Sequence, residues 1–204
     1  QTCALPISFA PAMAAVDSKG TSFWLMFPTN LSPGALTLFI TGDTATTGTV
    51  SVPGVGFSTP FSVTPGAVTS VSLPSSAEVS AVDTITNQGI RVVADAEVTV
   101  YGLNRVQATT DAFLGLPTDA LGTDYINLGF RNVNIVNATQ FGIVATQNGT
   151  VVTITPTAIA GARAANVPYT VTLNQGQTYL LRSTINGADL SGSRDKLHWF
   201  LCGW

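Results

Sequence analysis

The stretch Gly20-Thr21-Ser22-Phe23-Trp24, with Phe27 and Asn30 after it, returns about 100 residues later as Gly122-Thr123-Asp124-Tyr125-Ile126, followed by Phe130 and Asn132. Further anchors recur in the same order: Gly48-Thr49-Val50 as Gly149-Thr150-Val151, Pro60-Phe61-Ser62-Val63-Thr64 as Pro168-Tyr169-Thr170-Val171-Thr172, and residues 87–91 as 190–194. The number of residues between matching anchors is not constant, as expected if loops were inserted between fixed strands. The alternative is coincidence in a Thr/Val/Gly-rich background. We therefore predict two tandem copies of one β-rich module.

Apolar and polar residues alternate in short runs, as expected for half-buried strands. The runs are residues 36–40, 49–52, 61–63, 68–73, 91–94, 97–101, 140–146, 150–155, 169–173 and 178–182. Asp95-Ala96 predicts a bend or bulge. Gln147-Asn148-Gly149 predicts a hairpin with a type I′ turn, because Asn-Gly supplies positive φ angles. No helix longer than two turns is expected.

A period near 100 residues is the usual size of a β-sandwich. The predicted fold class is therefore all-β, with two tandem antiparallel β-sandwich-like modules, at residues 17–104 and 122–204, packed through an ordered crossover at 105–121. Residues 1–16 are interpreted as the remnant of an export signal, and the first seven as an artefact derived from a sequencing adapter. The tail at 195–204 does not alternate like a strand, so the second module is expected to be truncated and to lack its closing strand.

Charge is scarce: 9% of the 204 residues are charged and the formal net charge is −3. An average globular protein has about 25% charged residues. Without a basic patch to neutralise phosphates, nucleic acid and anionic membrane surfaces are not expected as partners. No apolar run reaches the roughly 18 residues of a transmembrane helix, so membrane insertion is not expected either.

Candidate catalytic and metal-binding residues are few. Asp95 and Glu97 share one strand face, which suits either a solvated pair or paired acid catalysis. Asp111, Asp119 and Asp124 around the crossover are weak candidates for a calcium site completed by backbone carbonyls.

Other reactive side chains lie in the chain ends. His198 has no second ligand nearby for a metal, and no Gly-x-Ser-x-Gly motif accompanies it for serine hydrolysis. Cys3 and Cys202 have no spacing typical of a disulfide framework. Trp24 and Tyr125 are expected to have equivalent roles in the two copies. They are interpreted as core anchors, and stacking on sugars is the alternative.

Several short segments of the sequence resemble the N-terminal domain of IgGFc-binding protein and its bacterial relatives, and together they span about residues 19–194. They are Gly20-Thr21-Ser22-Phe23-Trp24, residues 94–104, Thr109-Thr110-Asp111-Ala112-Phe113-Leu114, Leu116-Pro117 and Asn174-Gln175-Gly176-Gln177-Thr178-Tyr179. The resemblance implies an all-β region of a secreted or cell-surface protein, involved in adhesion or in contact with host glycoproteins or mucins. It implies no enzymatic activity and no cofactor, and it transfers no binding residue.

Three functional hypotheses follow. The first is a secreted or cell-surface recognition module that binds a glycoprotein, mucin or polysaccharide alongside other domains of a longer parent protein. The second is a structural stalk or surface-layer spacer without a ligand, and the third is a polysaccharide-active enzyme domain that uses Asp95 and Glu97. If the second module lacks its closing strand, the full chain should self-associate through an open sheet edge, whereas residues 17–115 alone should stay monomeric.

Overall fold

The computed structural model describes residues 17–107, 109–132 and 138–197. The described chain is almost entirely strand, and its helical segments are three short 3-10 turns: η1 (Pro53–Val55), η2 (Ser75–Ala77) and η3 (Thr118–Ala120). None of the helices in these ranges has the length and apolar composition needed to span a membrane. The predicted all-β, antiparallel fold is confirmed. Residues 1–16, Cys202 and His198 lie outside the described ranges.

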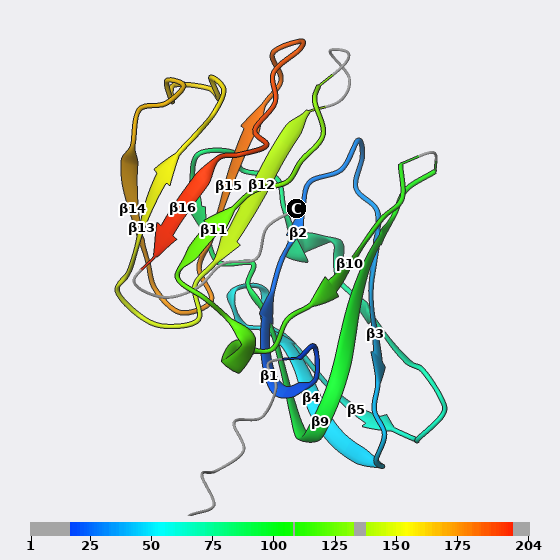
Figure 1. Ribbon diagram of the computed structural model, residues 1–204. Helices are drawn as coiled ribbons and strands as arrows, with labels where there is room; N and C mark the ends of the chain where they lie inside the picture. The colour runs from blue at the N-terminus through cyan, green and yellow to red at the C-terminus, as the bar shows by residue number, and fades with distance from the viewer. Residues whose placement is uncertain (1–16, 108, 133–137, 198–204) are drawn as a thin grey trace, which may run out of the picture.

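The first sandwich, which we define as residues 17–115, has two antiparallel sheets that share one long strand (Figure 1). One sheet has the order β5 (Phe57–Val63), β4 (Thr46–Val52), β9 (Ile90–Arg105) and β1 (Gly20–Leu25). The other has the order β6 (Thr69–Leu73), β3 (Ala35–Thr41), β9 and β10 (Asp111–Gly115).

The long strand β9 passes from one sheet to the other in its middle. Its pairing with β4 ends at Ala94, and its pairing with β3 begins at Thr99. The register with β1 shifts opposite the same stretch, so that Gly20 faces Val98 and Ser22 faces Val93. A bulge of this kind bends the bulged strand. The bend expected at Asp95-Ala96 therefore occurs where the strand crosses between the sheets.

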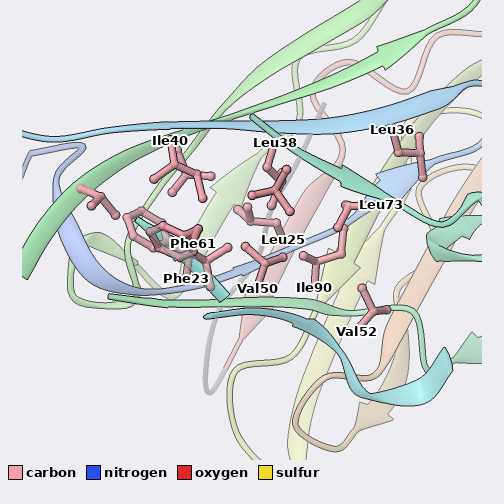
Figure 2. Close-up of a cluster of buried hydrophobic side chains, with 14 of the residues drawn as sticks. Phe23, Leu25, Leu36, Leu38, Ile40, Val50, Val52, Phe61, Leu73 and Ile90 are labelled. Carbon is pink, nitrogen blue, oxygen red and sulfur yellow. The ribbon is translucent and has the colours of Figure 1, made fainter. Parts of the chain in front are cut away.

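The core of the first sandwich is filled by the inward residues of both sheets. Figure 2 shows Phe23, Leu25, Leu38, Ile40 and Phe61 converging from three different strands, β1, β3 and β5, and all five are buried. On β3, every second residue from Leu36 to Ile40 is buried. The alternation seen in the sequence therefore marks the inner face of the sheet.

The second sandwich, which we define as residues 116–197, repeats this order of pairing. One sheet has the order β14 (Tyr169–Leu173), β13 (Thr150–Thr155), β16 (Arg194–Leu197) and β11 (Asp124–Ile126), which parallels β5, β4, β9 and β1. The other contains β12 (Thr139–Val144) and β15 (Thr178–Ser183), which pair as β3 and β6 do. Gly66 and Gly176, at equivalent turns, both have a φ of 78°. The division into two duplicated modules stays a prediction, and this shared order supports it.

Two details of the sequence-based prediction are wrong. The expected hairpin across Gln147-Asn148-Gly149 does not form, because β12 pairs with β15 while β13 pairs with β14 and β16 in the other sheet. Only Gly149 of the turn has a positive φ, whereas a type I′ turn requires two. The second correction concerns the closing strand: residues 194–197 form β16, which pairs with β11 and β13.

The two sandwiches are joined by more than a linker. Strand β8 (Ile85–Thr86), which belongs to the first half of the sequence, pairs with β15 and extends the sheet of the second sandwich. Met26, Val79 and Leu180 form a small buried cluster between the halves. Beside this cluster, the short strands β2 (Phe27–Pro28) and β7 (Glu78–Val79) pair in parallel. The junction therefore has its own core and its own backbone pairing.

Candidate functional site

A cleft of about 350 Å³ lies between the two sandwiches, next to this junction. We call it the inter-sandwich cleft. The first sandwich contributes Phe27, Thr29, Asn104 and Asp111 to its lining, and the second contributes Leu128, Phe130, Thr139 and Gln140. The side-chain amide of Gln140 donates to the Thr29 carbonyl at 2.8 Å and so links the two walls. Concave sites between structural units are the usual position of ligand sites.

One wall of the cleft is a loop at residues 127–132 that is firmly attached to the loop at 185–193. Asn127 donates its backbone N–H to Ser193 and accepts from Gly192, at 2.9 and 2.8 Å. At the other end, Asn132 donates to Ala188 at 2.8 Å and accepts from Gly187 at 2.7 Å.

Side chains reinforce this attachment. The buried amides of Asn127 and Asn132 donate to the carbonyls of Leu190 and Ile185, at 3.1 and 3.0 Å. In the middle of the loop, the Ser191 hydroxyl accepts from the N–H of Gly129 and donates to its carbonyl, both at 3.0 Å. The 127–132 loop is therefore held at both ends and at its centre.

This anchored loop presents two large apolar side chains to solvent: Leu128 is 81% exposed and Phe130 is 91% exposed. The position that matches Phe130 in the first copy is Phe27, which is fully buried. The ring of Phe27 meets the ring of Phe113 edge to face, with centroids 5.2 Å apart and planes at 72°. Of the two residues that the predicted repeat matches, Phe27 is thus covered by an aromatic partner and Phe130 is open.

Asp111 supplies the charge of the inter-sandwich cleft. Asn30 orients it by donating its amide to Asp111 Oδ2 at 3.1 Å and also to the Thr109 carbonyl. The neighbouring protein partly desolvates the carboxyl and raises its pKa, although the residue as a whole is exposed. Two amide oxygens in the cleft wall, Asn104 Oδ1 and Gln140 Oε1, are shielded from solvent and have no hydrogen-bond partner. The walls therefore contain more acceptors than the fold itself uses.

A second polar group, the Asp83 cluster, ties the halves together away from the cleft. Arg163 binds the Asp83 carboxylate through Nε at 2.9 Å and Nη2 at 2.7 Å, and its guanidinium lies 4.1 Å from the centre of the Tyr169 ring. The Tyr179 hydroxyl also donates to Asp83, and it lies 3.0 Å from the Tyr169 hydroxyl. Burial alone would raise the pKa of Asp83, but these hydrogen bonds and the charge of Arg163 lower it overall.

The Asp83 cluster has the side chains of an acid–base site, but its geometry favours a structural role. Burial raises the pKa of Tyr169 to about 12 and raises the pKa of Tyr179 further, so both phenols stay neutral. The Asp83 carboxylate is already occupied by three donor groups. Asp83 comes from the first half of the chain, and its two partner residues, Arg163 and Tyr179, come from the second, so the cluster fixes the relative position of the cleft walls.

The structure does not bring the three calcium candidates together. Asp111 lines the inter-sandwich cleft, Asp119 lines a separate cavity of about 480 Å³, and Asp124 is exposed on β11. Within the described ranges, no group of three or more acidic, histidine or cysteine side chains could hold a metal ion. Asp95 and Glu97 are both exposed on β9, and Asp95 accepts a hydrogen bond from Thr47. This arrangement matches the solvated pair.

The expected equivalence of Trp24 and Tyr125 is wrong by one position: Gly20 matches Gly122 in the repeat, so Tyr125 matches Phe23 and Trp24 matches Ile126. Trp24 is 4% exposed, lies against Gly176 of the second sandwich, and has the Arg91 guanidinium 5.3 Å from its ring centre. Tyr125 packs against the second core, and its hydroxyl accepts the N–H of Gly122 at 2.6 Å. Trp24 is buried and Tyr125 is half-buried against the second core, and this packing favours the interpretation as anchors. Trp24 also lines the cavity that contains Asp119.

The sequence did not predict two features of the site. One is the exposure of Leu128 and Phe130, and the other is the ion pair between Asp83 and Arg163. The sequence matches Phe130 to Phe27, but a match of this kind predicts the same burial for both residues, so it could not predict that Phe130 is exposed. Only the pairing of β10 with β9, which places Phe113 over Phe27, shows that the two environments differ.

Comparison with curated proteins gives no match, and comparison with solved structures gives none either. Residues 111–194, which run from the start of β10 to the start of β16, match the model of a family described as IgGFc binding protein, and this supports the family resemblance of that part of the chain.

Proposed function

We propose that this chain is a non-enzymatic recognition module of a secreted or cell-surface protein, and that it binds a glycoprotein, mucin or polysaccharide through the inter-sandwich cleft and the 127–132 loop. The family match supports recognition rather than catalysis. The observation that carries the proposal is the exposure of Leu128 and Phe130 on a loop whose backbone is bonded along its length.

Exposed apolar side chains on a fixed loop are suited to binding. Each loses little conformational freedom when a partner covers it, because the backbone beneath it is already ordered. Covering a phenylalanine and a leucine removes apolar surface from water, which contributes roughly 1.5–3 kcal/mol for each side chain that becomes fully buried. A contiguous apolar patch on a polar surface is typical of an interaction site.

Binding to an array of immobilised glycoproteins, mucins and polysaccharides tests this function. Replacing either Leu128 or Phe130 by Ser should weaken binding at least about tenfold, as expected for residues at the centre of an interface. Val68→Ser is the matched control, because Val68 is 62% exposed at the turn before β6 and lies outside the cleft lining. A folded chain that binds nothing on the array would favour the spacer hypothesis and contradict the proposal.

A further inference from the structure

The lining of the inter-sandwich cleft limits the chemistry of its ligand. Among the described lining residues, Asp111 is the one ionisable group, and the remainder are amides, hydroxyls, apolar side chains and backbone. Arg131 follows Phe130 in the loop, but its Nε donates to the Gly187 carbonyl at 3.1 Å on the side of the 185–193 loop. An anionic ligand would therefore meet a negative carboxylate and no cation in the lining.

The polar groups of the cleft favour a ligand that donates hydrogen bonds. A carboxylate has about four acceptor positions, and Asn30 fills one of those on Asp111. Hydrogen bonds between a neutral donor and a carboxylate are stronger than bonds between two neutral groups. Because Asn30 already fixes Asp111, the carboxylate is oriented before a ligand arrives.

The apolar groups require that the same ligand have an apolar face. The Phe130 ring is almost entirely open, and Leu128 stands two residues away on the same loop. A pyranose ring combines hydroxyl donors at its edge with a face of C–H groups that can lie on an aromatic ring. The cleft volume of about 350 Å³ is near the lower end for small-molecule sites, so it suits a short saccharide.

We propose that the inter-sandwich cleft binds a neutral saccharide, with a hydroxyl donating to Asp111 and a C–H face stacked on Phe130. This inference rests on the proposed function and specifies which part of a glycosylated partner the chain contacts. A basic peptide side chain could also pair with Asp111, but it would leave the open Phe130 face without a matching group in the same ligand.

The test measures binding of the full chain to immobilised neutral oligosaccharides that end in hexose or N-acetylhexosamine, and to the same oligosaccharides capped with sialic acid. We expect the neutral set to bind, and capping to weaken binding at least about tenfold, a difference of about 1.4 kcal/mol. Phe130→Ala and Asp111→Asn should each weaken neutral binding to a similar extent. Asp95→Asn and Val167→Ala, exposed residues outside the cleft lining, should bind as the unmodified chain does.

Each result bears on the inference. Equal or tighter binding to the sialylated set, or unchanged neutral binding by both cleft variants, would overturn it. Removing glycans enzymatically from a bound glycoprotein separates the two proposals: binding that survives deglycosylation would overturn the saccharide inference and leave recognition of a polypeptide in place. Failure to bind any glycoprotein, with or without its glycans, would instead overturn the proposed function.

Discussion

Replacing Asp195 by Asn should stabilise this protein at neutral pH and have a much smaller effect in acid. Asp195 lies on β16 opposite Tyr125 and Ile154, is 2% exposed, and has a side-chain oxygen without a hydrogen-bond partner. Burial raises the pKa of its carboxyl from 3.8 to about 7. The folded state therefore keeps a proton that the unfolded state releases between these two values.

The sign and size of the effect follow from this difference. Where the folded state binds more protons than the unfolded state, the free energy of unfolding falls as the pH rises. The loss begins near pH 4, is complete above about pH 7, and amounts to about three pKa units at about 1.4 kcal/mol each, or roughly 4 kcal/mol. Asn has nearly the same shape and does not titrate, so it avoids this loss.

Urea unfolding of both proteins at several pH values between 4 and 8 gives the measurement. The difference in the free energy of unfolding between Asp195→Asn and the unmodified chain should grow by a few kcal/mol across this range. Any packing cost of the amide is the same at every pH and cancels from that slope. Asp124→Asn, which changes an exposed carboxyl on the same sheet, is the matched control and should alter the free energy of unfolding little. A flat difference for Asp195→Asn across this range would refute the claim that this carboxyl is buried and protonated.

Three further predictions concern the junction of the sandwiches. Gly89→Ala should lower the free energy of unfolding by about 1–3 kcal/mol, because the new Cβ would lie 2.4 Å from the Gly176 carbonyl oxygen. Gly122→Ala is the control and should not lower it, because the atom nearest to its new Cβ would be 3.7 Å away. Equal urea midpoints for the two variants would contradict the close approach of Gly89 to Gly176. Asp83→Asn should cost about 1–3 kcal/mol at neutral pH by leaving Arg163 unpaired. Because the pKa of Asp83 is lowered in the folded state, this difference should shrink as the pH falls below about 4. Asp43→Asn, in the exposed pair with Lys19, is the matched control and should change the free energy of unfolding little at neutral pH. Residues 17–115 expressed alone should aggregate in light scattering, because Met26 and Val79 lose the cover of Leu180 and β8 loses its partner β15; a monomeric, cooperatively folded fragment would contradict this.

The last of these reverses the expectation from sequence, and the reason lies in β8. Two residues, Ile85 and Thr86, form this strand, and such a short segment has no periodicity that could predict its partner. By contrast, β3 and β6 alternate over five or more residues, and the sequence located both. Local alternation predicts which residues form strands and which face is buried, but not which sheet each strand joins.

The same limit explains the failed hairpin and the missed site. Asn148-Gly149 marks a turn, but its polar groups bind the turn after β14: Gly149 donates to Asn174, and Gln175 donates to Asn148. Likewise, the sequence places Phe130 at the same position as the buried Phe27, and only the tertiary contact with Phe113 distinguishes them. The candidate site depends on contacts between residues far apart in the chain, which a single sequence does not record.

Hydrogen exchange of the full chain, with and without a glycoprotein that it binds, tests the central claim most directly. If the inter-sandwich cleft is the recognition site, the partner should slow exchange in residues 127–132 and in β10, where Asp111 lies, and leave the turn between β5 and β6 unchanged. Protection confined to regions outside the cleft, with unchanged exchange in the 127–132 loop, would contradict it.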